Sequence, residues 1–249
     1  MIPVRLTDLH CHLLPGVDDG PSTMAESVAY AATAAAAGTG TIVATPHVEL
    51  VDVAELPDRV EELRAALDAE GIDLEVRCGG ELKPFSIPYL SDGDLDVIAH
   101  GPPGARWLLY EVPFHGADEE FAAGARELHE RGFAVLLAHP ERSEGMTDGG
   151  GLAVVESLVR DGALVAGNTG PLLGREGSGR RRAAELLLRR GLPAVVATDV
   201  HAPARPYTLA AAGEAIERVT GRPELARRLT AETPARLLAE GLAVDRRAA

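Results

Sequence analysis

Seven short apolar, β-branched runs alternate along this chain with amphipathic stretches of helical period, and this alternation narrows the choice of fold more than any other property. The runs read VRLTDLH, TIVATPH, LEVRCGGE, WLLYE, AVLLAHPE, LVAGNTG and AVVATDVH. Helices are expected between them, for example over residues 22–37, 56–69, 119–131 and 180–190. Repeated β-α units predict an α/β fold with a parallel sheet covered by helices. Because 249 residues suit one α/β barrel, we expect a single domain over residues 1–249.

Polar side chains stand at or just after the end of each run. All of them can bind a metal ion or form hydrogen bonds: His10, His12, His47, Glu81, Glu111, His139, Asn168, Asp199 and His201. A single histidine near a strand is more often a core or loop residue than a ligand. The shared placement reverses that expectation, because the carboxyl ends of barrel strands surround the active site. Imidazole and carboxylate ligands together suit Mn²⁺, Fe²⁺ or Zn²⁺.

The composition limits the partners and the compartment. A formal net charge of -14 argues against binding to nucleic acid or to an anionic membrane, since both select basic surfaces. No apolar run is long enough to insert into a bilayer, and no signal peptide is recognisable. The two cysteines, Cys11 and Cys78, fit a reducing compartment, so the cytoplasm is expected. We expect no disulfide between them, because their strands would lie about 10 Å apart.

Five motifs add a family resemblance to this pattern. Together, DLHCHLLPGVDDG, TPH, GGE, HPER and TDVH resemble the polymerase-and-histidinol-phosphatase (PHP) superfamily. Within it, they are similar to the bacterial manganese-dependent protein-tyrosine phosphatases of capsule and exopolysaccharide loci. The resemblance extends from Asp8 to about Gly241. It implies a distorted seven-stranded β/α barrel, TIM-like and PHP-type, that binds two or three divalent metal ions, with manganese preferred over iron or zinc.

The resemblance also implies roles for single residues. Nine metal ligands would form three sets: His10, His12, Glu81 and Asp199; Asp18, His47 and His201; and Glu81, Glu111 and His139. Glu81 would therefore bridge two metal ions. Asp8 shares a strand face with the first histidines, and we expect it to orient one of them. Arg142 and Arg205 would hold the phosphate, and Asn168 is expected to contact the substrate as well.

These residues imply a metal-dependent phosphomonoester hydrolase, most simply a protein-tyrosine phosphatase in which a metal-bound hydroxide attacks the phosphoryl group. The substrate would be a phosphotyrosine protein, such as a bacterial tyrosine kinase, or a small phosphoester. A phenolate leaving group, with a pKa of about 10, needs little help from a general acid. Lys83 and Phe85 follow the GGE motif where relatives carry other side chains, and both would line the entrance to the site.

Four other functions have to be weighed. A small-molecule phosphatase, such as a histidinol-phosphate phosphatase, would share the metal site. Only assays with histidinol phosphate and with phosphotyrosine side by side distinguish it from a protein-tyrosine phosphatase. An amidohydrolase often bridges its metals with a carbamylated lysine after strand four, where this chain has Glu111; its only lysine is Lys83. A nucleic-acid-processing domain conflicts with the negative charge. A non-enzymatic metal-dependent binding module conflicts with nine intact ligand candidates, and only an absence of turnover would favour it.

Overall fold

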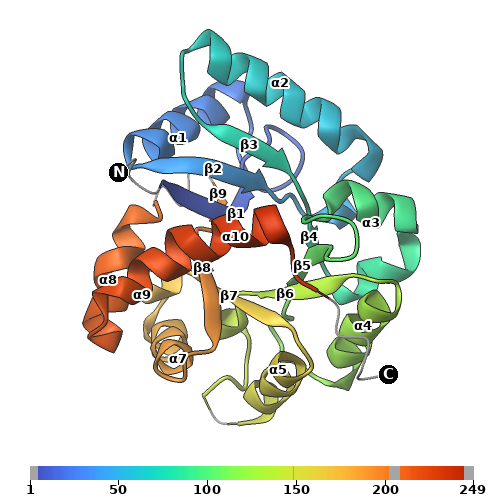
Figure 1. Cartoon of the computed structure of the whole chain (residues 1–249), viewed down its shortest axis with the longest axis vertical. Helices are drawn as coiled ribbons and strands as arrows, with labels where there is room; N and C mark the ends of the chain where they lie inside the picture. Colours follow the sequence, from blue (N-terminus) through green and yellow to red (C-terminus); the bar gives the residue numbers. More distant parts are fainter. Residues whose placement is uncertain (1–4, 148, 202–207, 244–249) are drawn as a thin grey trace.

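The computed structural model describes residues 5–147, 149–201 and 208–243. Within these residues, nine strands are present: β1 Leu6–His12, β2 Thr39–Ala44, β3 Glu75–Cys78, β4 Glu81–Leu82, β5 Trp107–Glu111, β6 Ala134–Ala138, β7 Leu164–Asn168, β8 Pro193–Ala197 and β9 Val200–His201. They form two parallel sheets with the orders β3-β2-β1-β9 and β4-β5-β6-β7-β8 (Figure 1). The predicted α/β fold with parallel strands is confirmed.

The predicted seven-stranded barrel needs correction, because two of the seven runs break into two strands each. The third run breaks at Gly79 and Gly80, between β3 and β4. A Cβ atom at Gly79 would lie 2.6 Å from the Val43 side chain, so glycine is required there by close packing. The seventh run breaks before β9 at Asp199, whose φ of 49° lies in the left-handed region. Both breaks fall where one sheet gives way to the other, so the strands do not close into one continuous ladder.

Helices follow the strands along the chain and form most of the outer layer (Figure 1). The helices of the described residues are α1 Met24–Ala36, α2 Leu56–Ala69, α3 Asp92–Ile98, α4 Glu119–Glu130, α5 Gly150–Arg160, α6 Thr169–Leu172, α7 Ser178–Arg189, α8 Ala210–Thr220, α9 Pro223–Arg227 and α10 Thr233–Glu240. Four of them match the expected helical stretches closely. Short helical turns join some elements: η1 Val48–Leu50, η2 Val53–Glu55, η3 Pro84–Tyr89, η4 Pro140–Arg142 and the π-helical η5 Arg228–Glu232.

Helix α10 packs against the strands at their amino-terminal end and crosses in front of them in Figure 1. Its residues Leu237 and Leu238 join an apolar cluster with residues of both sheets, including Leu9 and Leu136. The indole Nε1 of Trp107, at the start of β5, donates a hydrogen bond to the carbonyl of Leu237 at 3.0 Å. This packing closes the amino-terminal end of the strands and leaves their carboxyl ends as the accessible side.

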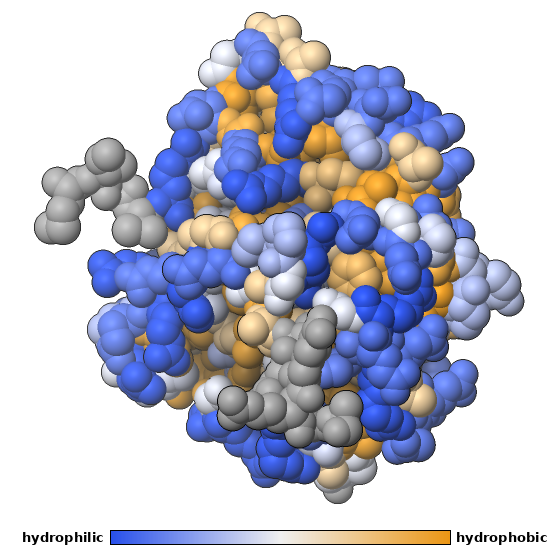
Figure 2. Space-filling model, turned by 45° about the vertical axis from the view of Figure 1, so that its right-hand side comes forward, coloured by the Kyte–Doolittle hydropathy of each residue, from blue (hydrophilic) through white to orange (hydrophobic). Residues whose placement is uncertain are grey.

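The outer surface is mainly hydrophilic on the face drawn in Figure 2, where hydrophobic residues show mostly between the polar ones. This distribution fits amphipathic helices that cover the sheets with their apolar sides. Within the described ranges, none of the helices combines the length and the apolar character needed to cross a membrane. Cys11 and Cys78 are both free thiols, which confirms that they do not form a disulfide.

Candidate metal centre

The carboxyl ends of the strands bring the predicted ligands together from both sheets. His10 and His12 belong to β1, Glu81 opens β4, and Glu111 ends β5. Asp18 lies in the loop between β1 and α1, and the remaining candidates come from residues at or just beyond the strand ends: His47, His139, Asp199 and His201. Most of the cluster is almost completely buried, including both β1 histidines at 0% exposure. The ligand types and their burial are what a metal centre requires.

Glu81 occupies the middle of this cluster. Its Oε1 lies 3.3 Å from His10 Nε2 and 2.9 Å from His139 Nε2. Its Oε2 lies 3.4 Å from His12 Nε2 and 3.0 Å from His47 Nδ1. Burial would raise the pKa of the Glu81 carboxyl, but the charge of His10 and the hydrogen bond with His139 bring it well below its usual value. Each carboxylate oxygen thus faces two imidazoles, an arrangement suited to a ligand shared between metal ions.

Candidate ligand atoms converge in four overlapping groups. In each group, the atoms of at least three side chains lie within 4.8 Å of one another: His12, Asp19, His47 and His201; His10, Glu81 and His139; His10, His12 and Asp199; and His47, Glu81 and Glu111. Because the groups share members, they form one continuous centre with room for more than one ion. These groups place the predicted ligands together, with one exchange.

The exchange concerns the two aspartates of the DDG motif. The Asp18 Oδ2 lies 2.6 Å from His12 Nδ1 and accepts a hydrogen bond from the backbone N–H of His47 at 3.1 Å. Asp19 Oδ1 instead lies 3.1 Å from His201 Nε2. Asp19 therefore joins a candidate ligand group, whereas Asp18, which we expected as a ligand, lies in none of these groups and contacts the His12 ring. Adjacent carboxylates of the same type carry no sequence signal that would distinguish these roles.

Asp8 also has a different partner from the one expected. Its carboxylate accepts hydrogen bonds from the backbone N–H and the hydroxyl of Thr198, at 3.0 and 2.5 Å, and from the backbone N–H of His10 at 3.3 Å. It orients the backbone before Asp199 and makes no hydrogen bond with an imidazole ring. The pairing of β1 with β2 shifts register between Asp8 and Cys11, so simple alternation does not apply through this part of the strand.

Asp199 is held by two residues that we expected to contact the substrate. Arg142 donates from Nη1 to Asp199 Oδ2 at 2.5 Å, and Asn168 donates from Nδ2 to the same oxygen at 2.8 Å. The Nε of Arg142 also lies 3.3 Å from Glu176 Oε2, a partner that no motif had indicated. Burial lowers the pKa of the Arg142 guanidinium, but these carboxylates raise it overall, so the group stays charged. The other predicted phosphate ligand, Arg205, lies outside the described residues.

Two ligand candidates adopt an unusual backbone conformation. In the described ranges, the non-glycine residues with positive φ are His139, at 37°, and Asp199, at 49°. Such conformations cost on the order of 1–3 kcal/mol and persist where the surrounding structure enforces them. Their position at two strand ends directs both side chains into the cluster. Local sequence propensity does not predict this strain.

The polar atoms of the cluster fit a divalent cation. Among the described residues, several buried atoms make no hydrogen bond, including both ring nitrogens of His10, Nε2 of His12, Nδ1 of His139 and Oε2 of Glu111. A buried polar atom without a partner costs about 1–3 kcal/mol, which a bound cation would offset. Burial and the nearby charge of Glu81 raise the pKa of Glu111 to about 7. A bound cation would therefore give the unpaired ring nitrogens a partner and reduce the repulsion between the Glu81 and Glu111 carboxylates.

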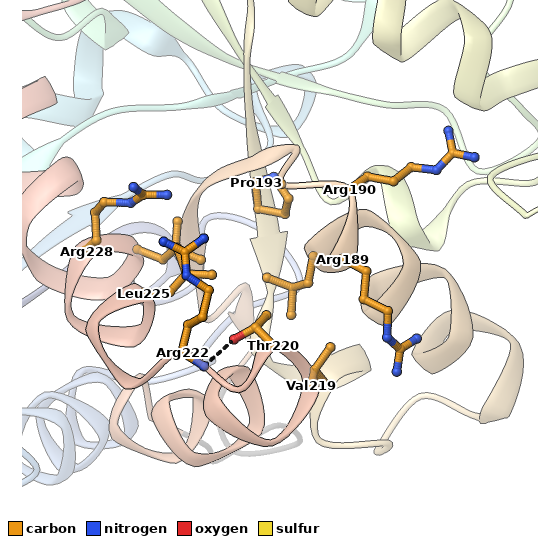
Figure 3. Close-up of a pocket in the computed structure, with 11 residues that line it drawn as sticks. Arg189, Arg190, Pro193, Val219, Thr220, Arg222, Leu225 and Arg228 are labelled. Atoms are coloured by element: carbon orange, nitrogen blue, oxygen red, sulfur yellow. Dashed lines mark hydrogen bonds between the residues drawn. The ribbon is translucent and has the colours of Figure 1, made fainter.

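A second hollow, of about 280 Å³, lies at the opposite end of the strands, beside Pro193 at the start of β8 (Figure 3). The guanidinium groups of Arg189 and Arg190 point away from it, and both pair with glutamates. Arg222 also pairs with a glutamate, and its backbone N–H donates to the Thr220 hydroxyl. Exposed ion pairs of this kind contribute little, and no group of candidate metal ligands in the described residues includes its lining. The chemistry therefore belongs to the cluster around Glu81.

A parallel α/β fold that gathers buried imidazoles and carboxylates at its strand ends defines a metal-dependent enzyme whose site opens on that side of the sheets. The family model described as capsular polysaccharide synthesis, CpsB/CapC, matches residues 6–239 of this chain. The chain therefore belongs to the CpsB/CapC family.

Individual relatives agree with this assignment. The chain is 28% identical over 200 residues to the tyrosine-protein phosphatase YwqE of Bacillus subtilis, covering 79% of this chain and 77% of YwqE. It is 24% identical to the tyrosine-protein phosphatase CpsB of Streptococcus pneumoniae, covering 95% of this chain and 100% of that protein. A crystal structure from work on YwqE and CpsB, described as unique metal-dependent tyrosine phosphatases, matches with a TM-score of 0.78 and 26% identity over 94% of both chains. The TatD homologue YJJV of Escherichia coli, at 18% identity, a TM-score of 0.54 and coverage of 94% and 98%, shares the fold alone.

Proposed function

We propose that this protein is a metal-dependent protein-tyrosine phosphatase. The observation that carries the proposal is the position of Glu81, whose two carboxylate oxygens each face two histidines in a buried cluster at the strand ends. Membership in the CpsB/CapC family and the likeness to YwqE and CpsB support phosphotyrosine as the group acted on. A bacterial tyrosine kinase is a fitting protein substrate, because such enzymes carry phosphotyrosine.

The cofactor proposed is a set of two or three divalent ions, with Mn²⁺ preferred and Fe²⁺ or Zn²⁺ as alternatives. Imidazole and carboxylate ligands, without thiolates, suit these ions. The ligands would be His10, His12, Asp19, His47, Glu81, Glu111, His139, Asp199 and His201, whose overlapping groups support more than one ion. When bound, such ions lower the pKa of water and polarise phosphoryl oxygens.

The chain's own residues supply orientation and charge. Asp18 orients the His12 ring through the contact with its Nδ1. Asn168 and Arg142 orient the Asp199 carboxylate by donating hydrogen bonds to its Oδ2. Arg142 remains charged at the edge of the centre, where its guanidinium can form bidentate hydrogen bonds with phosphate oxygens. Arg205 is proposed as a second phosphate ligand on the basis of its position after His201. Since phenolate leaves readily, no protonating side chain has to be assigned.

A turnover screen tests this proposal. Metal-replete protein should hydrolyse phosphotyrosine peptides with a kcat/KM at least about tenfold above those for histidinol phosphate and for sugar phosphates. A higher kcat/KM for histidinol phosphate would contradict the proposal in favour of a small-molecule phosphatase. No turnover of any phosphomonoester by protein with full metal content would point to a binding module instead.

A further inference from the structure

A second feature of the strand ends is an open recess of about 430 Å³ beside the metal centre. The walls of this recess, here called the aryl recess, include Lys83, Phe85, Glu111, Pro113, Phe114 and Phe121. Its volume falls in the range of small-ligand sites, which is about 300–1,000 Å³. Glu111 belongs both to this wall and to the ligand group with His47 and Glu81, so the recess and the metal centre adjoin.

Two exposed phenylalanines line the recess. Phe85 is 59% exposed and Phe114 is 45% exposed, and they belong to the few large apolar side chains that the described residues expose. Phe85 lies in η3, and Phe114 follows the end of β5, so residues from different parts of the chain meet around one hollow. A concave site with exposed aromatic walls next to a few convergent polar groups is typical of a ligand-binding site.

Phe114 also connects the recess with the centre that is proposed to bind phosphate. The centroid of the Phe114 ring lies 5.9 Å from the centroid of the His139 ring. The guanidinium carbon of Arg142 lies 4.8 Å from the centroid of the Phe114 ring. In an aryl phosphate, a single oxygen atom joins the phosphorus to the ring. A phosphoryl group held beside His139 and Arg142 therefore brings the ring of its ester to the wall formed by Phe114.

We propose that the aryl recess binds the aromatic ring of the phosphotyrosine side chain, and that Phe85 and Phe114 make the enzyme selective for aryl over alkyl phosphomonoesters. This inference rests on the proposed function and adds the residues that determine its specificity. Aromatic rings pack favourably in offset or edge-to-face arrangements with centroids about 4.5–7 Å apart, and an alkyl ester cannot make this contact.

The test compares two substrates in the metal-replete enzyme. Phe85→Ala and Phe114→Ala should each lower kcat/KM for a phosphotyrosine peptide about tenfold, and should change kcat/KM for glycerol phosphate and the inhibition constant of inorganic phosphate less than about twofold. Phe114→Tyr should restore most of the activity, because it keeps the ring. The matched control is Tyr89→Ala, which removes an aromatic side chain, 86% exposed, from η3 outside the recess.

The outcomes separate this inference from the proposed function. Equal losses on the aryl and alkyl substrates, or a loss of bound metal, would show a structural effect and overturn the specificity role. Phosphotyrosine turnover that is unchanged in both alanine variants would overturn the aryl recess and leave the phosphatase proposal standing. If the unmodified protein fails to hydrolyse phosphotyrosine, the proposed function itself is overturned.

Discussion

Glu81→Gln is the single substitution that should damage the metal centre most. The glutamate carboxylate is 1% exposed, and its oxygens lie 2.9–3.4 Å from nitrogens of four histidines. Glutamine keeps the size of the side chain but removes the charge. It also replaces one oxygen by an amide nitrogen that cannot bind a cation. The substitution therefore removes the negative charge and one of the two ligand oxygens without opening a cavity.

The expected size of the effect follows from burial. Removing one partner of a buried, charged interaction costs about 3–5 kcal/mol. Since about 1.4 kcal/mol corresponds to a factor of ten in an equilibrium constant, affinity for the ion that loses this ligand should fall about a hundredfold to several thousandfold. At moderate metal concentrations, the variant should hold at least one ion fewer per chain than the unmodified protein.

Calorimetric metal titration, elemental analysis and phosphotyrosine turnover measure this effect together. Glu141→Gln is the matched control, because Glu141 is equally buried, at 2% exposure, but belongs to none of the ligand groups. Its Oε1 accepts a hydrogen bond from the Asn168 backbone N–H, which a glutamine oxygen can also accept. Full metal content and full activity in Glu81→Gln, or an equal loss of metal in the control, would rule out Glu81 as a shared ligand.

Asp19→Asn should lower metal affinity at least about tenfold more than Asp18→Asn, because Asp19 faces His201 while Asp18 orients a ring. Equal affinities of the two variants in metal titrations would contradict this difference in roles. Arg142→Ala should lower kcat/KM about a hundredfold through loss of a charge-assisted phosphate contact, with metal content as the second readout; a loss below about threefold would remove this role. Burial lowers the pKa of His100 from 6.5 to about 3, so the stability that its neutral form contributes above pH 6.5 is lost as the pH falls toward 3. Between pH 7 and pH 5, the free energy of unfolding of the metal-free protein should fall by about 2 kcal/mol through this residue. Denaturant titrations at the two pH values should show this fall in the control His129→Gln, whose histidine is half-buried in α4, and not in His100→Gln.

The sequence predicted the helices and most of the ligand cluster because both depend on local patterns. The stretch over 56–69 carries the helical period of α2, and the structure has the helix over Leu56–Ala69. The polar residues after each strand-like run share one end of a parallel fold, so their convergence follows from strand direction alone. Neither result required knowledge of contacts between distant residues.

The differences all involve tertiary geometry. The third run contains Gly79 and Gly80, but only the approach of Val43 shows why the strand breaks there. The left-handed backbone at Asp199 is enforced by its surroundings and leaves no local signal. Likewise, the pairing of Arg142 with Glu176 joins residues 34 positions apart, and spacing did not indicate it.

Metal removal and reconstitution would show whether hydrolysis of phosphotyrosine by this protein requires bound divalent ions. The purified protein would be stripped with a chelator and then titrated with Mn²⁺ while hydrolysis of a phosphotyrosine peptide and bound metal are measured on the same samples. Turnover should disappear in the stripped protein and return as two or three ions bind per chain. Phosphotyrosine turnover that persists without metal, or full turnover with no more than one ion per chain, would contradict this expectation.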